Sequence, residues 1–141
     1  MAVAGIRNEG GVKKRIKKLL FDHAWWSWMP ATHGYGTSGV SDFNALHKGG
    51  VFLAIEAKFG SNKPTPQQLN YLHLVKDLDG FAFVVNEKNL DSLEAWLEAF
   101  GRAVKAQLAG EPVTHEDGAM MANAMIELLA MLYPDAKPAN D

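Results

Sequence analysis

Three residues near the middle of the chain have side chains suited to chemistry, namely Asp42, Glu56 and Lys58. The apolar run at residues 51–55 predicts a buried strand that leads into Glu56, and Lys58 follows two positions later. Because side chains alternate faces along a strand, Glu56 and Lys58 share one face. Burying charged groups is costly unless they are paired or bind a metal. The pattern therefore predicts a polar site at the end of this strand.

The position of Asp42 relative to Glu56 depends on the turn between two predicted strands. Asp42 begins a strand-like run that ends at His47, and the Lys-Gly-Gly segment at 48–50 precedes Val51. A three-residue turn closed by His47 and Val51 would place Asp42 directly opposite Glu56. A two-residue turn made of the glycines alone would put the two carboxylates on opposite faces. We predict the longer turn, or a bulge, so that both acids and the lysine converge.

Such a set of side chains is typical of a hydrolytic metal site. The oxygens of Asp42 and Glu56 suit Mg²⁺ or Mn²⁺ rather than Zn²⁺. A metal held there polarises a phosphate and lowers the pKa of bound water. Lys58 could orient that water or stabilise charge on the phosphate. The simpler alternative is a Glu56–Lys58 ion pair that only satisfies the end of the strand.

The bulk composition limits the classes of protein to consider. A length of 141 residues indicates one domain. The formal net charge of −2 shows no general basic character, so any nucleic-acid binding must depend on local patches. The absence of cysteine excludes disulfides and thiolate metal sites. No apolar run approaches the roughly 18 residues of a membrane span, and no signal segment precedes the basic cluster. We expect a cytoplasmic protein without membrane contact, in the host cytoplasm if it is viral.

The elements that must position these residues predict a mixed α/β domain of order α-β-β-β-α-β-α-α. Hydrophobic periodicity, capping residues and Gly or Pro breaks define the segments. The expected helices cover about 9–23, 65–78, 90–108 and 114–133, and the expected strands cover about 25–29, 42–47, 51–55 and 81–85. The last helix is rich in methionine and has more apolar surface than one face can bury, which indicates an oligomer contact.

The first predicted helix has one apolar and one basic side. Glu9 projects onto the apolar side, which is an unusual place for a carboxylate. The basic side could bind phosphates that flank a scissile bond, or it could be only a solvated helix face. The candidate DNA-binding residues are Lys13, Lys14, Lys17 and Lys18 on this helix, together with Lys63, Gly36 and Ser38.

The loop at 34–39 has the spacing G-x-G-x-x-G, but we expect no nucleotide cofactor there. That fingerprint requires a helix to begin at its last glycine, whereas a strand follows here. The loop could approach a DNA backbone through Gly36 and Ser38, or it could be a plain connection. Trp25, Trp26 and Trp28 alternate, so at least one should face outward or meet a partner. For these rings, sheet packing is favoured over base stacking.

Four segments together resemble the VRR-NUC family, the virus-type replication-repair branch of the PD-(D/E)xK nucleases, in its stand-alone phage or bacterial form. The resemblance covers about residues 9–97, with the segments in matching order and spacing. One departure is Ser41, which stands where the family usually has proline. The matching segments are Gly39-Val40-Ser41-Asp42, Ala54-Ile55-Glu56-Ala57-Lys58, Lys63-Pro64-Thr65-Pro66-Gln67 and Phe81-Ala82-Phe83-Val84-Val85.

The resemblance implies a restriction-endonuclease-like core and a Mg²⁺- or Mn²⁺-dependent endodeoxyribonuclease. Asp42, Glu56 and the backbone carbonyl of Ala57 would be metal ligands. Lys58 would be the catalytic lysine, Gln67 would support the lysine or the water, and Glu9 would be a further metal or water ligand.

The resemblance also divides the chain and indicates a substrate. Residues 1–110 would form the nuclease domain, and residues 111–141 a helical extension packed on it or at a dimer interface. Stand-alone members of the family are similar to compact homodimers that cut branched DNA, including four-way (Holliday) junctions. The alternatives are a flap, single-strand or RNA nuclease, and a non-catalytic nucleic-acid-binding module on the same fold.

Overall fold

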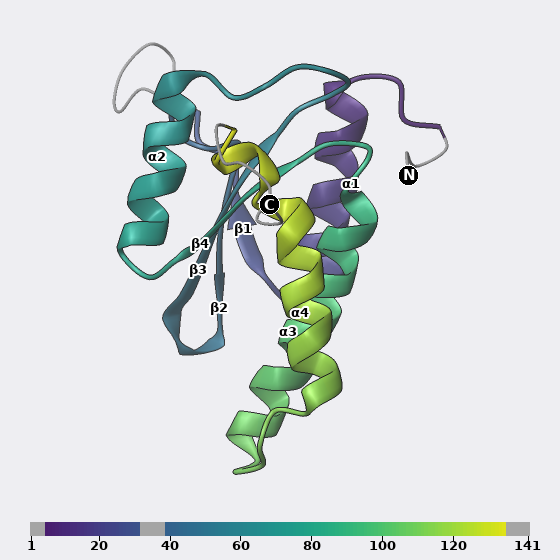
Figure 1. Cartoon of the computed structure of the whole chain (residues 1–141), viewed down its shortest axis with the longest axis vertical. Helices are drawn as coiled ribbons and strands as arrows, with labels where there is room; N and C mark the ends of the chain where they lie inside the picture. The colour runs from purple at the N-terminus through teal and green to yellow at the C-terminus, as the bar shows by residue number, and fades with distance from the viewer. Residues whose placement is uncertain (1–4, 32–38, 135–141) are drawn as a thin grey trace, which may run out of the picture.

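The protein is an α/β structure with a four-stranded mixed sheet flanked by helices, as expected (Figure 1). The computed structural model describes residues 5–31 and 39–134. The sheet order is β1 (Trp26–Trp28), β2 (Phe43–His47), β3 (Val51–Ala57) and β4 (Phe81–Val85). The first two pairings are antiparallel, and β3 pairs with β4 in parallel. The predicted order of helices and strands is confirmed.

The turn between β2 and β3 has the predicted three residues, a short 3₁₀ segment η1 (Lys48–Gly50). His47 pairs with Val51, and the pairing continues to Phe43 and Ile55. Gly49 and Gly50 have φ values of 83° and 76°, which glycine adopts without the steric cost of a Cβ. The strand begins at Phe43 rather than at Asp42. Asp42, the residue before β2, nevertheless continues the same register, which brings it opposite Glu56.

Helices cover both faces of the sheet (Figure 1). α2 (Pro66–Asp77) lies on one face, whereas α1 (Glu9–Asp22) and α3 (Leu90–Leu108) lie on the other, with α4 (His115–Leu128) packed on α3. α2 begins as predicted, with Pro66 in its first turn and a Thr65–Gln68 capping box. Of the described helices, none is long and apolar enough to cross a membrane.

Side-chain alternation along β3 divides the core into two clusters. Leu53, Ile55 and Ala57 belong to the larger cluster with α1, α3 and α4, whereas Ala54 belongs to the smaller cluster under α2. Glu56 has the parity of Ala54, so it lies on the α2 face, as the period of two requires. The expected sharing of one face by Glu56 and Lys58 follows from the same alternation.

The last predicted helix is shorter than expected. α4 ends at Leu128 rather than near residue 133, and a 3₁₀ segment η2 (Ala130–Leu132) follows. This tighter turn places Leu132, which is buried, in the small cluster under α2, whereas Leu128 belongs to the larger cluster. Between residues 128 and 132, the apolar side chains thus contribute to the core on both sides of the sheet.

The three neighbouring tryptophans have different environments. Trp25 is buried in the larger core, where its ring lies 5.4 Å from that of Phe100. Trp26 and Trp28 are exposed. The prediction that at least one of them faces outward is therefore confirmed, while packing in the core holds for Trp25.

Candidate active site

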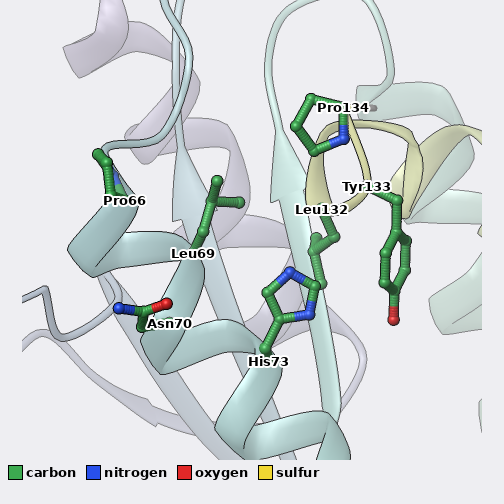
Figure 2. A pocket seen from close by; sticks show the side chains of 7 residues that line it. All are labelled: Pro66, Leu69, Asn70, His73, Leu132, Tyr133 and Pro134. Carbon is green, nitrogen blue, oxygen red and sulfur yellow. The ribbon is translucent and has the colours of Figure 1, made fainter. Parts of the chain in front are cut away.

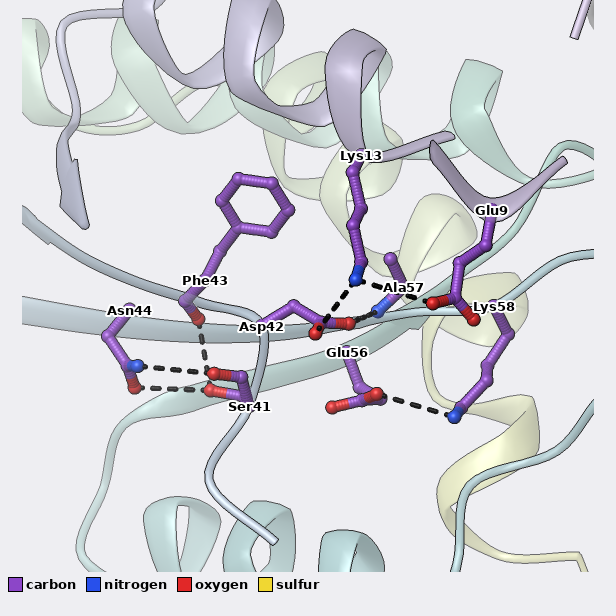
Figure 3. Close-up of polar contacts among 9 residues, drawn as sticks. All are labelled: Glu9, Lys13, Ser41, Asp42, Phe43, Asn44, Glu56, Ala57 and Lys58. Carbon is purple, nitrogen blue, oxygen red and sulfur yellow. Dashed lines mark hydrogen bonds and ion pairs between the residues drawn. The ribbon is translucent and has the colours of Figure 1, made fainter. Parts of the chain in front are cut away.

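Glu56 is the buried centre of the candidate site. Its side chain comes from the penultimate residue of β3 and is 2% exposed. One carboxylate oxygen lies 3.4 Å from the Lys58 ammonium, and the other has no hydrogen-bond partner within the described residues (Figure 3). Burial, with the nearby charge of Asp42, raises the pKa of Glu56 to about 8, although Lys58 acts in the opposite direction. A buried carboxylate with an unsatisfied oxygen is poised to accept a cation.

Asp42 is fixed to the same strand end by a backbone contact. Its Oδ2 accepts a hydrogen bond of 2.9 Å from the backbone N–H of Ala57, fifteen residues away. The three-residue turn makes this contact possible because it brings the residue before β2 alongside the last residues of β3. The register of β2 and β3 and this hydrogen bond thus hold Asp42 beside Glu56.

A small polar network fixes the chain around Asp42. Ser41, at the position where the resembling family usually has proline, donates from its hydroxyl to the backbone oxygen of Phe43 at 3.0 Å. Asn44 Oδ1 accepts from the Tyr71 hydroxyl at 2.7 Å, which ties β2 to α2. These hydrogen bonds, one buried and one part-buried, fix the start of β2 next to Asp42.

Lys13 enters the site from α1 and lies between two acids. Its ammonium is 3.3 Å from Glu9 and 3.4 Å from Asp42 (Figure 3). Burial acts to lower the pKa of Lys13, but the charges of Asp42 and Glu9 outweigh it and raise the pKa overall. Sequence periodicity places Lys13 on the basic side of α1, as part of a phosphate-binding or solvated face, whereas in the structure it is half-buried and paired with Glu9 and Asp42. Sequence periodicity missed this lysine as part of the acidic site.

The donor set fits a hard divalent cation. Asp42 and Glu56 offer oxygen ligands, and the buried unpaired oxygen of Glu56 lacks the compensation that a cation would supply. Glu9 belongs to the site through Lys13. Within the described chain, its carboxylate does not form a group with Asp42 and Glu56 in which all ligand atoms lie within 4.8 Å of one another.

The other predicted site residues that the structure describes are all exposed. Gln67 is in the first turn of α2 and is exposed, and its backbone packs closely against Gly39. Lys63 is exposed in the segment between β3 and α2. Lys14, Lys17 and Lys18 are exposed on α1 as expected, and Lys18 pairs with Asp22 at 2.9 Å. Gly36 and Ser38 lie outside the described residues.

A different group of ligand-type side chains joins α1 to α3. Ligand atoms of His23, Glu94 and Glu98 all lie within 4.8 Å of one another, and all three residues are half-buried. No histidine in the sequence has zinc-type spacing. The four-residue separation of Glu94 and Glu98 was the only local signal, and the proximity of His23 follows from helix packing.

A pocket of about 510 Å³ lies between α2 and η2 (Figure 2). Its described lining includes no Asp, Glu, Lys or Arg, so it lacks the donor set for hydrolysis. The lining residues are Pro66, Leu69, Asn70, His73, Leu132, Tyr133 and Pro134.

No protein-family model matches this chain, and no curated protein matches it either. The resemblance to the VRR-NUC family therefore stays a prediction from the sequence motifs. The function must be inferred from the chemistry of the site residues themselves.

Proposed function

We propose that this protein is a divalent-metal-dependent endonuclease with a PD-(D/E)xK core that hydrolyses DNA phosphodiester bonds. One observation carries the proposal. Glu56 is buried beside Asp42 and Lys58, and one of its oxygens has no partner among the described residues. A protein rarely keeps such a carboxyl group buried without a use, because burying a polar oxygen that lacks a partner is costly. The mixed sheet with helices on both faces is compatible with this core.

The residues divide the work of the reaction. Asp42 and Glu56, with the backbone carbonyl of Ala57, would hold Mg²⁺ or Mn²⁺. The metal would polarise a phosphate of the substrate and lower the pKa of water. Lys58, whose side chain is 12% exposed, holds positive charge within 3.4 Å of Glu56. In this place it can stabilise the negative charge that develops on the phosphate or orient the attacking water. Water loses a proton as it adds to phosphorus, the bond from phosphorus to the leaving ester oxygen breaks, and that oxygen takes up a proton from the solvent to become a hydroxyl group.

Glu9, Lys13 and Gln67 have supporting positions in this proposal. Lys13 keeps Asp42 and Glu9 compensated when no metal is bound, since its ammonium lies within 3.4 Å of both carboxylates. Gln67 would approach the water or Lys58 from α2. The exposed lysines of α1 and Lys63 would bind phosphates on either side of the cut bond. A homodimer with two such sites would suit a substrate with two symmetric strands, such as a four-way junction.

The test is cleavage of labelled four-way junction, splayed-arm, single-stranded and linear duplex DNA in Mg²⁺ or Mn²⁺. Glu56→Gln and Asp42→Asn should abolish cleavage while the far-UV circular dichroism is unchanged. Glu111→Gln, at an exposed acid beyond α3, is the matched control and should cut like the wild type. Full activity in either site variant would refute the assignment.

The substrate profile separates the forms of the proposal. Paired symmetric nicks in the junction alone would indicate a dimeric junction resolvase. Cutting of flaps or single strands would keep the nuclease and discard the resolvase. Binding without cutting of any DNA or RNA would instead indicate a non-catalytic nucleic-acid-binding module.

A further inference from the structure

An exposed aromatic surface lies on the same face of the sheet as the candidate active site. It consists of Trp26, Trp28 and Phe52. Trp26 and Trp28 are 67% and 37% exposed, although both belong to a strand. Their ring centroids are 5.0 Å apart, and that of Phe52 lies 6.3 Å from Trp28. This surface belongs to the outer half of the sheet, because α2 packs against β3 and β4.

The strand register shows where the two tryptophans lie relative to Glu56. Trp26 is aligned with Phe52 through Leu46, and Trp28 is aligned with Ala54 through Asn44. Phe52, Ala54 and Glu56 alternate on one face of β3. At about 3.3 Å per residue along a strand and about 4.8 Å between neighbouring strands, the two tryptophans, two strands away, lie about 12 and 16 Å from Glu56. Stacked nucleotides rise about 3.4 Å each, so these distances correspond to about three to five nucleotides.

The charges near the aromatic surface suit a polyanion. Glu56 is the only acid in the sequences of β1, β2 and β3, and Asp42 directly precedes β2. The exposed Lys48 follows β2 at the end of the sheet nearest Trp26, whereas Lys58 at the other end is mostly buried and paired with Glu56. A nucleic acid lying across this face would therefore meet an exposed cation beside Trp26 and aromatic rings that lead towards the site. Such a combination is typical of surfaces that bind single strands without sequence preference.

We propose that Trp26 and Trp28 form a stacking platform for unpaired bases of the nucleic-acid substrate, about three to five nucleotides from the bond that is cut. The inference rests on the proposed nuclease function, because the distance to the cut bond is counted from Glu56. Tryptophan rings offer flat faces to any base, which explains why two of them stay exposed on a strand beside the site. The preferred substrate thus contains a single-stranded segment next to the cleavage point.

The first experiment measures binding in a chelator, where no cleavage occurs. The affinities of labelled oligothymidine and of a blunt duplex are determined by fluorescence anisotropy for wild type, Trp26→Ala and the double variant with Trp28→Ala. Loss of stacking should weaken oligothymidine binding between about fivefold and a hundredfold, and duplex binding by at most about twofold. Trp26→Phe should recover most of the affinity, because it restores an aromatic face.

Phe21→Ala provides the matched control. Phe21 is 81% exposed on α1, which covers the opposite face of the sheet, so its loss should leave both affinities unchanged. The single variant Trp26→Ala is a control for misfolding of the double variant. Trp28 packs against Phe52, whereas Trp26 is mostly exposed, so its loss should not disturb the fold. The thermal unfolding of Trp26→Ala should match that of the wild type. Oligothymidine should quench wild-type tryptophan emission, and the quenching should disappear in the double variant.

Three results would overturn the platform. They are unchanged oligothymidine affinity in the double variant, an equal loss on the duplex, and a wild-type dimer that Trp26→Ala converts to a monomer in light scattering. The last would assign the surface to contact between two copies of the chain. Because binding is measured without metal, failure of cleavage leaves the platform standing, and failure of the platform leaves the nuclease standing.

Discussion

The Lys13 ammonium lies 3.4 Å from a carboxylate oxygen of Asp42, a residue that we propose as a metal ligand. The same ammonium is 3.3 Å from Glu9, so a cation of the protein itself compensates two acids of the site. A divalent metal bound to Asp42 would meet this charge at close range. Lys13 therefore competes with the metal for Asp42, and the cost of moving it is part of the metal affinity.

Replacing Lys13 should strengthen metal binding. In Lys13→Met the competing charge is gone, so we expect the affinity for Mn²⁺ to rise by about tenfold, equivalent to about 1.4 kcal/mol. Isothermal titration calorimetry with Mn²⁺ measures this directly, without DNA. Lys17→Met, one turn later on the exposed side of α1, is the control and should bind as the wild type. An unchanged or weaker affinity in Lys13→Met would show that the lysine supports the metal instead.

The buried carboxyl of Glu56 should make the metal-free protein less stable as the pH rises from about 5 to about 8. In the unfolded chain Glu56 loses its proton near its ordinary pKa of 4.5, whereas burial raises the folded pKa to about 8. Between these values the unfolded state binds fewer protons, so a rise in pH favours unfolding. Thermal melting in a chelator measures the effect, and Glu56→Gln should lack it. Parallel melting curves for the two proteins across this range would contradict the prediction.

Lys58 should contribute to the rate more than to metal binding. Loss of its charge next to the reacting phosphate should lower kcat by about a hundredfold or more, the range for removal of one group that stabilises transition-state charge. Lys58→Met is compared with wild type in single-turnover cleavage, and its metal affinity is measured by calorimetry. Lys105→Met, at an exposed lysine of α3, serves as control. An unchanged turnover would remove Lys58 from the mechanism.

Gly39 should be the glycine least tolerant of substitution near the site. It has a φ of 78°, and an added Cβ would lie 2.4 Å from the backbone oxygen of Gln67. Gly39→Ala should therefore destabilise the fold by about 1 kcal/mol or more and move the first turn of α2. Gly101→Ala, inside α3 with open space around its Cβ, should instead stabilise by up to about 1 kcal/mol. Urea unfolding of both variants gives the comparison, and equal effects would contradict it.

The predicted positions of the Asp42, Glu56 and Lys58 side chains are confirmed where the geometry is local. Glu56 and Lys58 share a face because a strand alternates with a period of two, whatever packs on it. The three-residue turn brought Asp42 to the end of β3, because one residue more or fewer would reverse the face. The start of α2 was also local, since Thr65 and Pro66 satisfy or avoid the donors of its first turn.

Contacts between different helices and strands could not be predicted from local sequence geometry. Lys13 falls on the basic side of its helix by sequence periodicity, yet the end of β3 faces it and draws its ammonium to Asp42. His23 meets Glu94 and Glu98 only because α1 packs against α3. Periodicity gives the direction of a side chain about its own axis, but the neighbour in that direction depends on how the helices pack.

The helices and strands, the turn, and the shared face of Glu56 and Lys58 are encoded locally in the sequence, because they depend on backbone geometry over a few residues. Tertiary packing was needed for the burial that raises the pKa of Glu56, the pairing of Lys13, and the exposure of Trp26. Each of these depends on which surfaces other elements cover. α2 packs on β3 and β4, so the same sheet face holds both a buried carboxylate and an exposed pair of tryptophans.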